Sequence, residues 1–268
     1  MKGYSLTYIF HDCFVYEDEA VVIVFDFWKD PLDNGNGENP PFLDLFKVNK
    51  AKYVVVSHHH KDHFTRRIFL WQKMFTDLNY IVSADVYRTV KYMFREDSVY
   101  GGFRPDASKV AVLKPGERYE DGILTVVAFG STDIGNSYAV ESQGRKVFHA
   151  GDLNAWLWLD ESTEKEVREA REQYERIVAD IKRRYERFDL VMFPVDSRIG
   201  REYWWGAGYF VRQILTDLFV PMHFELADNE EELTKRHLDA CAFRYYANQE
   251  HGDYLLLTGT RSRYFSTR

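Results

Sequence analysis

The sequence predicts one α/β domain that spans residues 1–268. Short apolar, β-branched runs alternate with helix-compatible segments along the whole chain, and two β-rich halves each end in helical stretches. The length of 268 residues and the hydrophobic content of 45% are enough for one substantial core. The sequence has no repeat of fixed period and no low-complexity segment that would divide it.

The first half is predicted to begin with an antiparallel hairpin. Residues 4–16 and 20–28 are β-rich, and the acidic turn 17–19 separates them. Residues 31–41 concentrate Pro, Gly, Asn and Asp, which is typical of a surface loop. The apolar run 52–56 indicates a buried strand. After it we expect a helix at 65–78, a strand at 80–83 and a helix at 85–94.

The second half is predicted to contain a β-rich block and then the longest helix. In this helix Thr163 and Glu166 have the spacing of a capping box, and an apolar stripe runs from Val167 to Phe188 at three- and four-residue steps. We expect its charged residues to form a solvated face, with a homo-oligomer contact as the alternative. The strands of this half are expected at 109–113, 118–119, 124–129, 138–141, 146–149, 190–193, 218–220 and 254–257.

Composition and charge argue against several classes of protein. The formal net charge of -7 is unfavourable for binding a nucleic-acid backbone. Cys13 and Cys241 are too few for a disulfide framework and have no zinc-binding spacing. His11 and Asp12 interrupt the N-terminal run before a signal peptide could form, and no stretch approaches the length of a membrane span. We therefore expect a cytoplasmic protein that does not enter a membrane.

The segment Ser57–His63 carries the clearest chemical signal. It directly follows the predicted strand 52–56, and its side chains His58, His60, Asp62 and His63 are good ligands for first-row metals. Imidazole and carboxylate suit Zn²⁺, Fe or Mn²⁺, and the lack of thiolates argues against a purely structural zinc site. Residues two apart in such a loop can point the same way. One loop can therefore serve two ions.

This pattern, His58-x-His60-x-Asp62-His63 after an apolar strand, resembles the signature of the metallo-β-lactamase superfamily, and later motifs match in the same order over nearly the whole chain. The resemblance implies an α/β (α+β) fold, a four-layer αββα sandwich with the metal site at the edge between two sheets. The segments 10–14 and 148–154 look most like a branch of metal-dependent hydrolases related to ascorbate-6-phosphate lactonase-like proteins.

The resemblance also implies roles for three residues outside the loop. Asp152 follows Gly151 and is similar to the family's carboxylate that bridges two ions; the Gly allows close approach of the backbone. His223 follows a short apolar strand and is similar to the last ligand. Asp26 ends the first hairpin and resembles a buried carboxylate that supports the metal loop.

One ligand that the family usually has is missing. In place of a Gly-His-Thr sequence the chain has Ser131 at the position of the His, with Asp133 two residues later. Three alternatives follow from this difference. Asp133 could replace the imidazole, or water could fill the gap beside His58, His60 and Asp152. In the third alternative the first site is weak and only one ion binds tightly. His149 is a further candidate, either as a ligand or as a support for one.

The resemblance implies a hydrolase that uses a metal-activated hydroxide on an ester, lactone or phosphoester small-molecule substrate. We expect one or two Zn²⁺ ions per chain, with Fe or Mn as alternatives, and we expect Asp62 to orient the hydroxide and accept its proton. Arg198 and Arg201 are candidate substrate-binding residues. Five aromatic residues would either wall the pocket or fill core gaps: Trp156, Trp158, Tyr203, Trp204 and Trp205.

Three other functions compete with hydrolysis. An iron-dependent oxidoreductase could use the same ligands. A nuclease that cleaves RNA or DNA is disfavoured by the acidic charge balance. The missing His suggests a non-catalytic descendant of the family. In that case, however, the remaining ligand side chains would be polar groups whose burial without a bound ion costs free energy.

Overall fold

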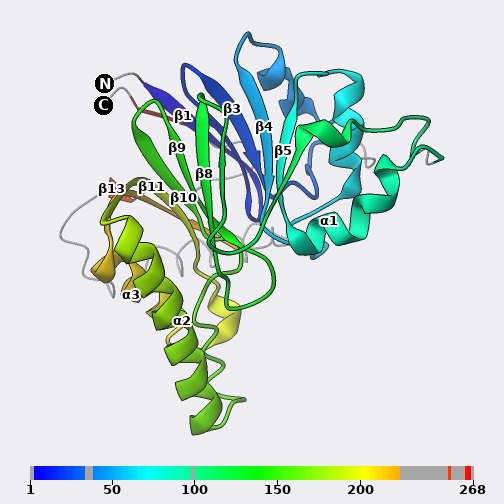
Figure 1. Ribbon diagram of the computed structural model, residues 1–268. Helices are drawn as coiled ribbons and strands as arrows, with labels where there is room; N and C mark the ends of the chain where they lie inside the picture. The colour runs from blue at the N-terminus through cyan, green and yellow to red at the C-terminus, as the bar shows by residue number, and fades with distance from the viewer. Residues whose placement is uncertain (1–2, 34–38, 98–99, 224–252, 255–262, 267–268) are drawn as a thin grey trace.

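Two mixed β-sheets lie face to face at the centre of the molecule (Figure 1). The computed structural model describes residues 3–33, 39–97, 100–223, 253–254 and 263–266, and within them each sheet has seven strands. Helices lie on the outer side of both sheets (Figure 1). The predicted four-layer αββα arrangement is confirmed.

The first sheet is antiparallel at one end and parallel at the other. Its strands β1 to β3 pair antiparallel, and β3 to β6 pair in parallel. The central parallel strands are apolar almost throughout, because both of their faces are covered. In sheet order the strands are β14 (Arg263–Ser266), β1 (Tyr4–Phe10), β2 (Cys13–Glu17), β3 (Val21–Phe25), β4 (Ala51–Val56), β5 (Asn79–Ser83) and β6 (Val110–Leu113).

The second sheet repeats this design. Its strands β7 to β10 pair antiparallel, and β10 to β13 pair in parallel. In sheet order the strands are β13 (Asp253–Tyr254), β12 (Leu215–Met222), β11 (Arg187–Pro194), β10 (Arg145–His149), β9 (Ser137–Ser142), β8 (Leu124–Phe129) and β7 (Arg118–Glu120).

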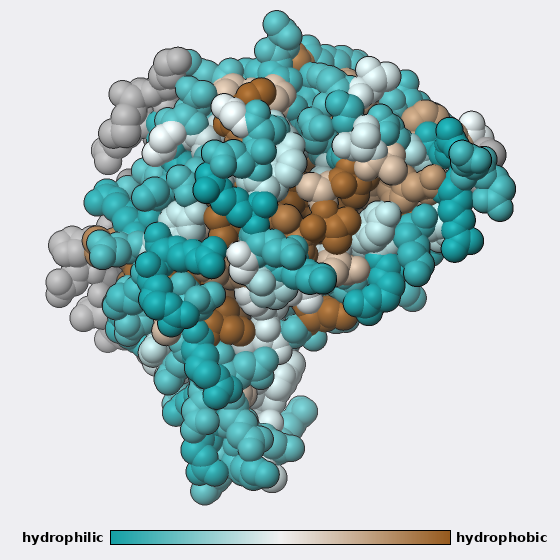
Figure 2. Space-filling model, viewed as in Figure 1, coloured by the Kyte–Doolittle hydropathy of each residue, from teal (hydrophilic) through white to brown (hydrophobic). Residues whose placement is uncertain are grey.

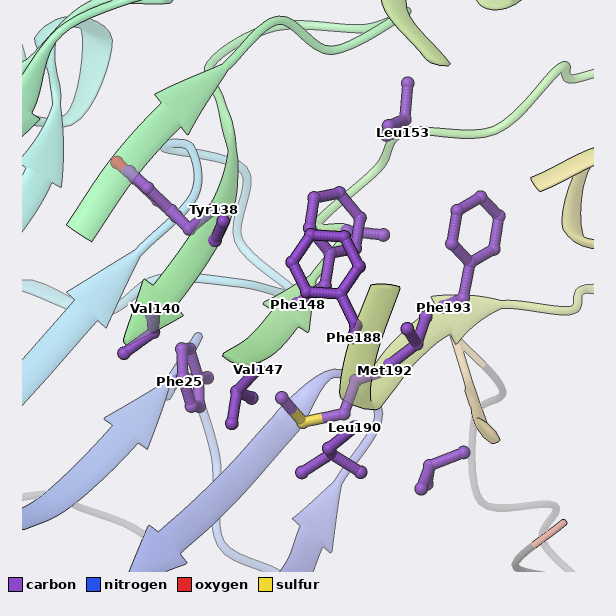
Figure 3. Close-up of a cluster of buried hydrophobic side chains, with 14 of the residues drawn as sticks. Phe25, Tyr138, Val140, Val147, Phe148, Leu153, Phe188, Leu190, Met192 and Phe193 are labelled. Carbon is purple, nitrogen blue, oxygen red and sulfur yellow. The ribbon is translucent and has the colours of Figure 1, made fainter. Parts of the chain in front are cut away.

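The main core lies between the sheets and under the helices of the second sheet. Figure 3 shows Phe25 of the first sheet facing Val140 and Val147 of the second. A separate apolar cluster fills the space on the other side of the first sheet, around Phe27 and Trp71. Both sheets are therefore held by apolar burial on two faces.

Three α-helices and five short 3₁₀ helices accompany the sheets within the described ranges. α2 begins at the predicted capping box of Thr163 and Glu166, and it buries Tyr174, Val178 and Ile181. Its first half projects from the body and is hydrophilic on the visible face (Figure 2). The helices are α1 (Ala84–Val90), α2 (Glu164–Arg184), α3 (Trp205–Gln213), η1 (Pro41–Phe46), η2 (Arg66–Lys73), η3 (Lys91–Phe94), η4 (Ala107–Lys109) and η5 (Ser197–Ile199).

The first predicted strand, residues 4–16, is in fact two strands. The chain reverses at His11 and Asp12, so that β1 and β2 form a hairpin of their own. His11 has a left-handed backbone with φ of 55°, which makes the tight reversal without Gly or Pro. The predicted hairpin with its turn at 17–19 is also present, because β2 pairs antiparallel with β3.

The predicted helices and later strands differ at their ends. The segment 65–78 forms only η2, whose five consecutive buried residues, 68–72, pack on several sides. The segment 85–94 forms all of α1 except its first residue, and then η3. The stripe of α2 does not reach Phe188, which belongs to β11 because the backbone becomes extended at Tyr185. The strand at 254–257 is observed only as β13; its remainder and Cys241 lie outside the described residues. No helix in the described part of the chain is long and apolar enough to cross a membrane.

Candidate metal centre

The predicted functional side chains lie where strands of both sheets end. Parallel strands place their carboxyl ends at the same edge of a sheet. In the first sheet Asp26 follows β3 and the loop 57–63 follows β4, and in the second sheet Asp152 and His223 follow β10 and β12. The facing edges of the two sheets thus bring these distant segments together.

The buried carboxylate of Asp26 holds the loop 57–63 in place. One of its oxygens accepts the Ser57 backbone N–H at 2.7 Å, and the other accepts the Ser57 hydroxyl and lies 2.9 Å from His63 Nδ1. Burial raises the pKa of Asp26, but the hydrogen bond to His63 and the nearby imidazoles outweigh it and hold the pKa below its usual value. Asp26 therefore has the geometry of the supporting carboxylate that the resemblance implies.

A first group of ligand atoms comes from both sheets. His58, His60, Asp133 and Asp152 each offer one atom, and these atoms all lie within 4.8 Å of one another. His58 Nε2 is 3.2 Å from an Asp152 oxygen, and His60 Nδ1 is 3.6 Å from an Asp133 oxygen. Ser131 instead accepts the Asp133 backbone N–H at 3.3 Å. Of Ser131 and Asp133, it is thus Asp133 whose side chain lies beside His60.

A second group lies on the other side of Asp152. His63 Nε2 and His223 Nε2 are 3.0 and 3.2 Å from the same Asp152 oxygen, whereas His58 approaches the other oxygen. Asp62 joins this second group through a set of atoms within 4.8 Å that also includes His11, His63 and His223. One carboxylate therefore presents one oxygen to each group, which is the geometry of a bridging ligand.

The polar atoms at this centre fit a bound cation. His58 Nε2, His63 Nε2 and Asp152 Oδ1 are buried, yet none of them makes a hydrogen bond within the described residues. Buried polar atoms almost always have partners, and several unsatisfied ones at one point are exceptional. Since His63 Nε2 and Asp152 Oδ1 lie only 3.0 Å apart and neither makes a hydrogen bond within the described residues, both atoms can converge on a shared ion.

Two residues at the centre were not predicted as ligands, His11 and Asp12 in the turn between β1 and β2. Both are 0% exposed, and their side-chain nitrogen and oxygen atoms have no hydrogen-bond partner in the part of the chain that the structure describes. The His11 ring lies 4.4 Å from the His223 ring, and an Asp12 oxygen lies 3.5 Å from His63 Nδ1. The sequence signal that could have revealed them is that His11 and Asp12 are two adjacent polar residues inside the apolar run 4–16.

Outer contacts fix the orientation of three imidazoles. His63 Nδ1 faces Asp26, and His223 Nδ1 faces Asp196 at 3.1 Å. Because a carboxylate only accepts, both Nδ1 atoms must carry the proton. His58 Nδ1 lies 2.9 Å from the Ser57 hydroxyl, which already donates to Asp26 and so accepts from His58. In each case Nε2 is left to face the centre.

His149 is placed as a support, since both of its nitrogens have partners. Its Nε2 lies 2.9 Å from the Asp12 carbonyl oxygen and its Nδ1 accepts the Gly151 N–H at 3.2 Å. Its ring stacks on Phe25 with centroids 4.9 Å apart. His149 therefore connects the β1–β2 turn to the turn that carries Asp152.

The two arginines predicted to bind substrate have different surroundings. The Arg198 guanidinium forms hydrogen bonds of 2.7 to 3.0 Å with both oxygens of Asp196, the carboxylate next to His223. Arg201 pairs with Asp160, and both side chains are largely exposed. Arg198 is thus linked to the metal centre, whereas Arg201 lies in a surface ion pair.

Among the predicted aromatic residues, Trp156 contacts the centre directly. Its ring meets His223 edge-on at 5.2 Å, and its Nε1–H donates to the Asp152 carbonyl oxygen at 2.8 Å. Trp205 packs against Tyr174 and Tyr209. Trp156 is only partly buried and can form part of a pocket wall. Tyr203 and Trp204 are partly buried and pack against the main core, and Trp158 is 37% exposed.

Charges at the centre shift the pKa values of the ligands. Burial lowers the pKa of His223, but the Asp12 and Asp152 carboxylates outweigh it and raise the pKa to about 10. The pKa of His63 is raised by the same carboxylates against the same effect of burial. Burial raises the pKa of Asp152, but His63 and His223 hold it well below its usual value.

These shifts predict how metal affinity depends on pH. A metal needs the neutral imidazole of His223, so below a pKa of about 10 the ion must displace a proton. The apparent affinity for Zn²⁺ should therefore rise with pH, by about tenfold per unit for each displaced proton. Competition with a chromophoric chelator at pH 6.5, 7.5 and 8.5 measures this. An affinity that stays constant over this range would contradict it.

The fold and the ligand groups define an αββα protein with residues suited to divalent metals at the edge between its sheets. Residues 23–224 match the family described as the Beta-lactamase superfamily domain, so the chain belongs to this family. The resemblance inferred from the His cluster is thereby confirmed. No curated protein matches the chain.

Several solved structures share the fold. Igni18, a metallo hydrolase from Ignicoccus hospitalis, is 16% identical with a TM-score of 0.60, over 98% of both chains. YhfI, a metallo-β-lactamase fold protein from Bacillus subtilis, is 11% identical with a TM-score of 0.60, over 99% of this chain and 100% of that one. CmlA, a diiron β-hydroxylase from Streptomyces venezuelae, is 14% identical with a TM-score of 0.63, over 98% of this chain and 54% of that one.

Proposed function

We propose that this protein is a metal-dependent hydrolase of an ester, lactone or phosphoester in a small molecule. The observation that carries the proposal is the pair of ligand groups that share Asp152. Divalent ions held there would lower the pKa of water from about 16 to about 7 and polarise the bond under attack. The family and the description of Igni18 as a metallo hydrolase support this class of reaction.

The substrate would approach from the side where the centre is open. The side chains of His60, Asp62 and Asp133 are 43 to 46% exposed, whereas those of His58 and His63 are 0% exposed. His60 and Asp133 of the first group and Asp62 of the second thus face solvent, whereas His58 and His63 lie deeper. A small molecule can reach the exposed side without a rearrangement of the core.

On this open side Asp62 is suited to orient the attacking water. The neighbouring His11 imidazole holds the pKa of Asp62 well below its usual range against the effect of partial burial, so the carboxylate is ionised at neutral pH. An ionised carboxylate accepts a hydrogen bond from water and fixes its direction. The same lowered pKa makes Asp62 a weak base, so orientation of the water is favoured over the uptake of its proton that the resemblance implies.

Zinc is the metal that we propose for the second group. Three imidazoles, from His11, His63 and His223, lie there with the carboxylates of Asp62 and Asp152, and such a mixed nitrogen and oxygen set without thiolates suits Zn²⁺. We place the protein in the reducing cytoplasm, because the chain has only two cysteines.

The first group supports a second candidate function, an iron-dependent oxidoreductase. Because Asp133 stands in for an imidazole, this group has two carboxylates and two imidazoles. A larger share of oxygen ligands shifts preference towards iron or manganese. CmlA, which shares the fold, is described as a diiron β-hydroxylase.

One experiment separates the two functions. Protein purified without added metal is analysed for zinc, iron and manganese and for its visible spectrum. It is then reconstituted with each metal and tested on lactones, phosphodiesters, phosphomonoesters, thioesters and β-lactams. We expect hydrolysis with zinc in at least one substrate class. Stoichiometric iron with a redox-active absorption band and no hydrolysis would instead establish the oxidoreductase.

A further inference from the structure

A chain of three side chains leads from the surface to the second ligand group. The Arg198 guanidinium binds both oxygens of Asp196, with Nε at 2.9 and 3.0 Å and a terminal nitrogen at 2.7 Å. Asp196 Oδ2 in turn lies 3.1 Å from His223 Nδ1. The Arg198 side chain is 42% exposed and that of Asp196 4%, so the chain runs inward.

Asp196 is held in place by its own position in the fold. It follows β11, whose parallel neighbour β12 ends just before His223, and the Val195 N–H donates to the Met222 carbonyl oxygen at 3.1 Å. Its carboxylate also accepts the backbone N–H of Arg198 at 2.9 Å. The Arg198 side chain and the two adjacent strand ends therefore leave Asp196 little freedom to turn.

His223 needs such support more than an ordinary strand-end residue does. Its backbone is left-handed, with φ of 68°, which is unfavourable for a residue with a Cβ. Trp156 and His11 contact its ring at 5.2 and 4.4 Å, but neither of these ring contacts fixes the direction of Nε2. The bond to Asp196 does so, because it sets both the tautomer and the tilt of the imidazole.

We propose that Arg198 is a positioning residue for the second metal site, acting through Asp196 on His223, and that it does not bind the substrate. This inference rests on the proposed metal-dependent function. The Arg198 guanidinium donates to both carboxylate oxygens of Asp196, so the donors that face the centre are already used in this contact.

Arg201 provides a matched control. It also pairs with an aspartate, Asp160, with its Nε at 3.0 Å from one oxygen. In this pair, however, the side chains are 72% and 60% exposed, and within the described ranges no imidazole forms a hydrogen bond or ion pair with Asp160. Exposed ion pairs of this kind contribute little to stability. Arg201→Gln should therefore remove the charge of a surface arginine without changing the affinity for metal.

The test is stepwise binding of Zn²⁺ to metal-free full-length protein, followed by chelator competition. The variants are Arg198→Gln, Arg198→Lys and Arg201→Gln, each also made in a His60→Gln background that weakens the first group so that the second is measured alone. We expect R198Q to lose about 10- to 100-fold in affinity at the second site. R198K keeps the charge but not the bidentate geometry and should fall between R198Q and the unchanged protein, and R201Q should bind as the unchanged protein does.

The outcomes separate this inference from the proposed function. If the unchanged protein binds two ions and R198Q binds both equally well, Arg198 does not position His223 and the inference is wrong. If the unchanged protein binds no divalent metal, the proposed function fails with it. Circular dichroism and the melting temperature check the fold, and R198K remains as the test if R198Q does not fold. If R198Q keeps its zinc affinity but has a raised KM at saturating zinc for a substrate found in the panel, Arg198 binds the substrate and the inference is wrong.

Discussion

Asp152→Ala should remove both metal ions and lower hydrolysis at least about 10³-fold, while the protein stays folded. Asp152 is the one described carboxylate with an oxygen directed to each ligand group, through His58 on one side and His63 and His223 on the other. Without it the imidazoles lose the negative charge that holds them together. Loss of a single terminal ligand such as His60 should also abolish turnover, but it should leave the second ion bound.

Metal content, turnover on the best substrate of the panel and circular dichroism should be measured on the same preparations. Asp217→Ala is a suitable control, because this exposed carboxylate pairs with Arg187 near the start of β12, at the other end of the strand from His223. If D152A or His60→Ala turned over substrate at the normal rate in preparations whose metal content is known, the assignment of this centre as the catalytic site would be wrong.

Gly135→Ala should destabilise the protein by about 3 kcal/mol or more and disrupt the first ligand group. Gly135 has φ of +81°, and a Cβ there would lie 2.2 Å from the Ser57 carbonyl oxygen and 2.5 Å from the His58 Cβ. Both neighbours belong to the metal loop and cannot shift without moving His58. Denaturant unfolding and zinc affinity measure the two effects.

Gly122→Ala is the matched control for this substitution. Gly122 has nearly the same φ, +84°, but a Cβ there would meet nothing within 4 Å. It should therefore cost only the conformational part, about 1 kcal/mol, and leave the metal affinity unchanged. Equal destabilisation by the two substitutions would show that the contact with the metal loop does not matter.

The sequence predicted the fold class and the ligand segments well, for physical reasons. Parallel strands buried on both faces read as continuous apolar runs, so residues 52–56 marked a strand and the His cluster marked its end. The resemblance extended this to Asp26, Asp152 and His223, and the structure brings all three to one centre. Whether these residues bind metal stays a prediction.

Other parts could not be predicted because they depend on tertiary contacts. His11 and Asp12 lie in a reversal without the usual Gly, Pro or Asn, so the run 4–16 read as one strand. The choice of Asp133 over Ser131 depends on which side chain turns towards His60. The role of Arg198 depends on Asp196, whose contact with His223 is made across two neighbouring strands.

The backbone at the metal centre has a consequence for attempts to engineer this protein. His11, Asp26, Trp156 and His223 all have positive φ, between 41° and 68°, where glycine would be preferred. Each costs on the order of 1 kcal/mol or more, which the apolar core must offset. Asp26 is retained by its buried hydrogen bonds to Ser57 and His63. Selection for thermostability alone should favour replacements at the other three positions, and the more stable variants obtained in this way would have lost side chains that surround the metal centre.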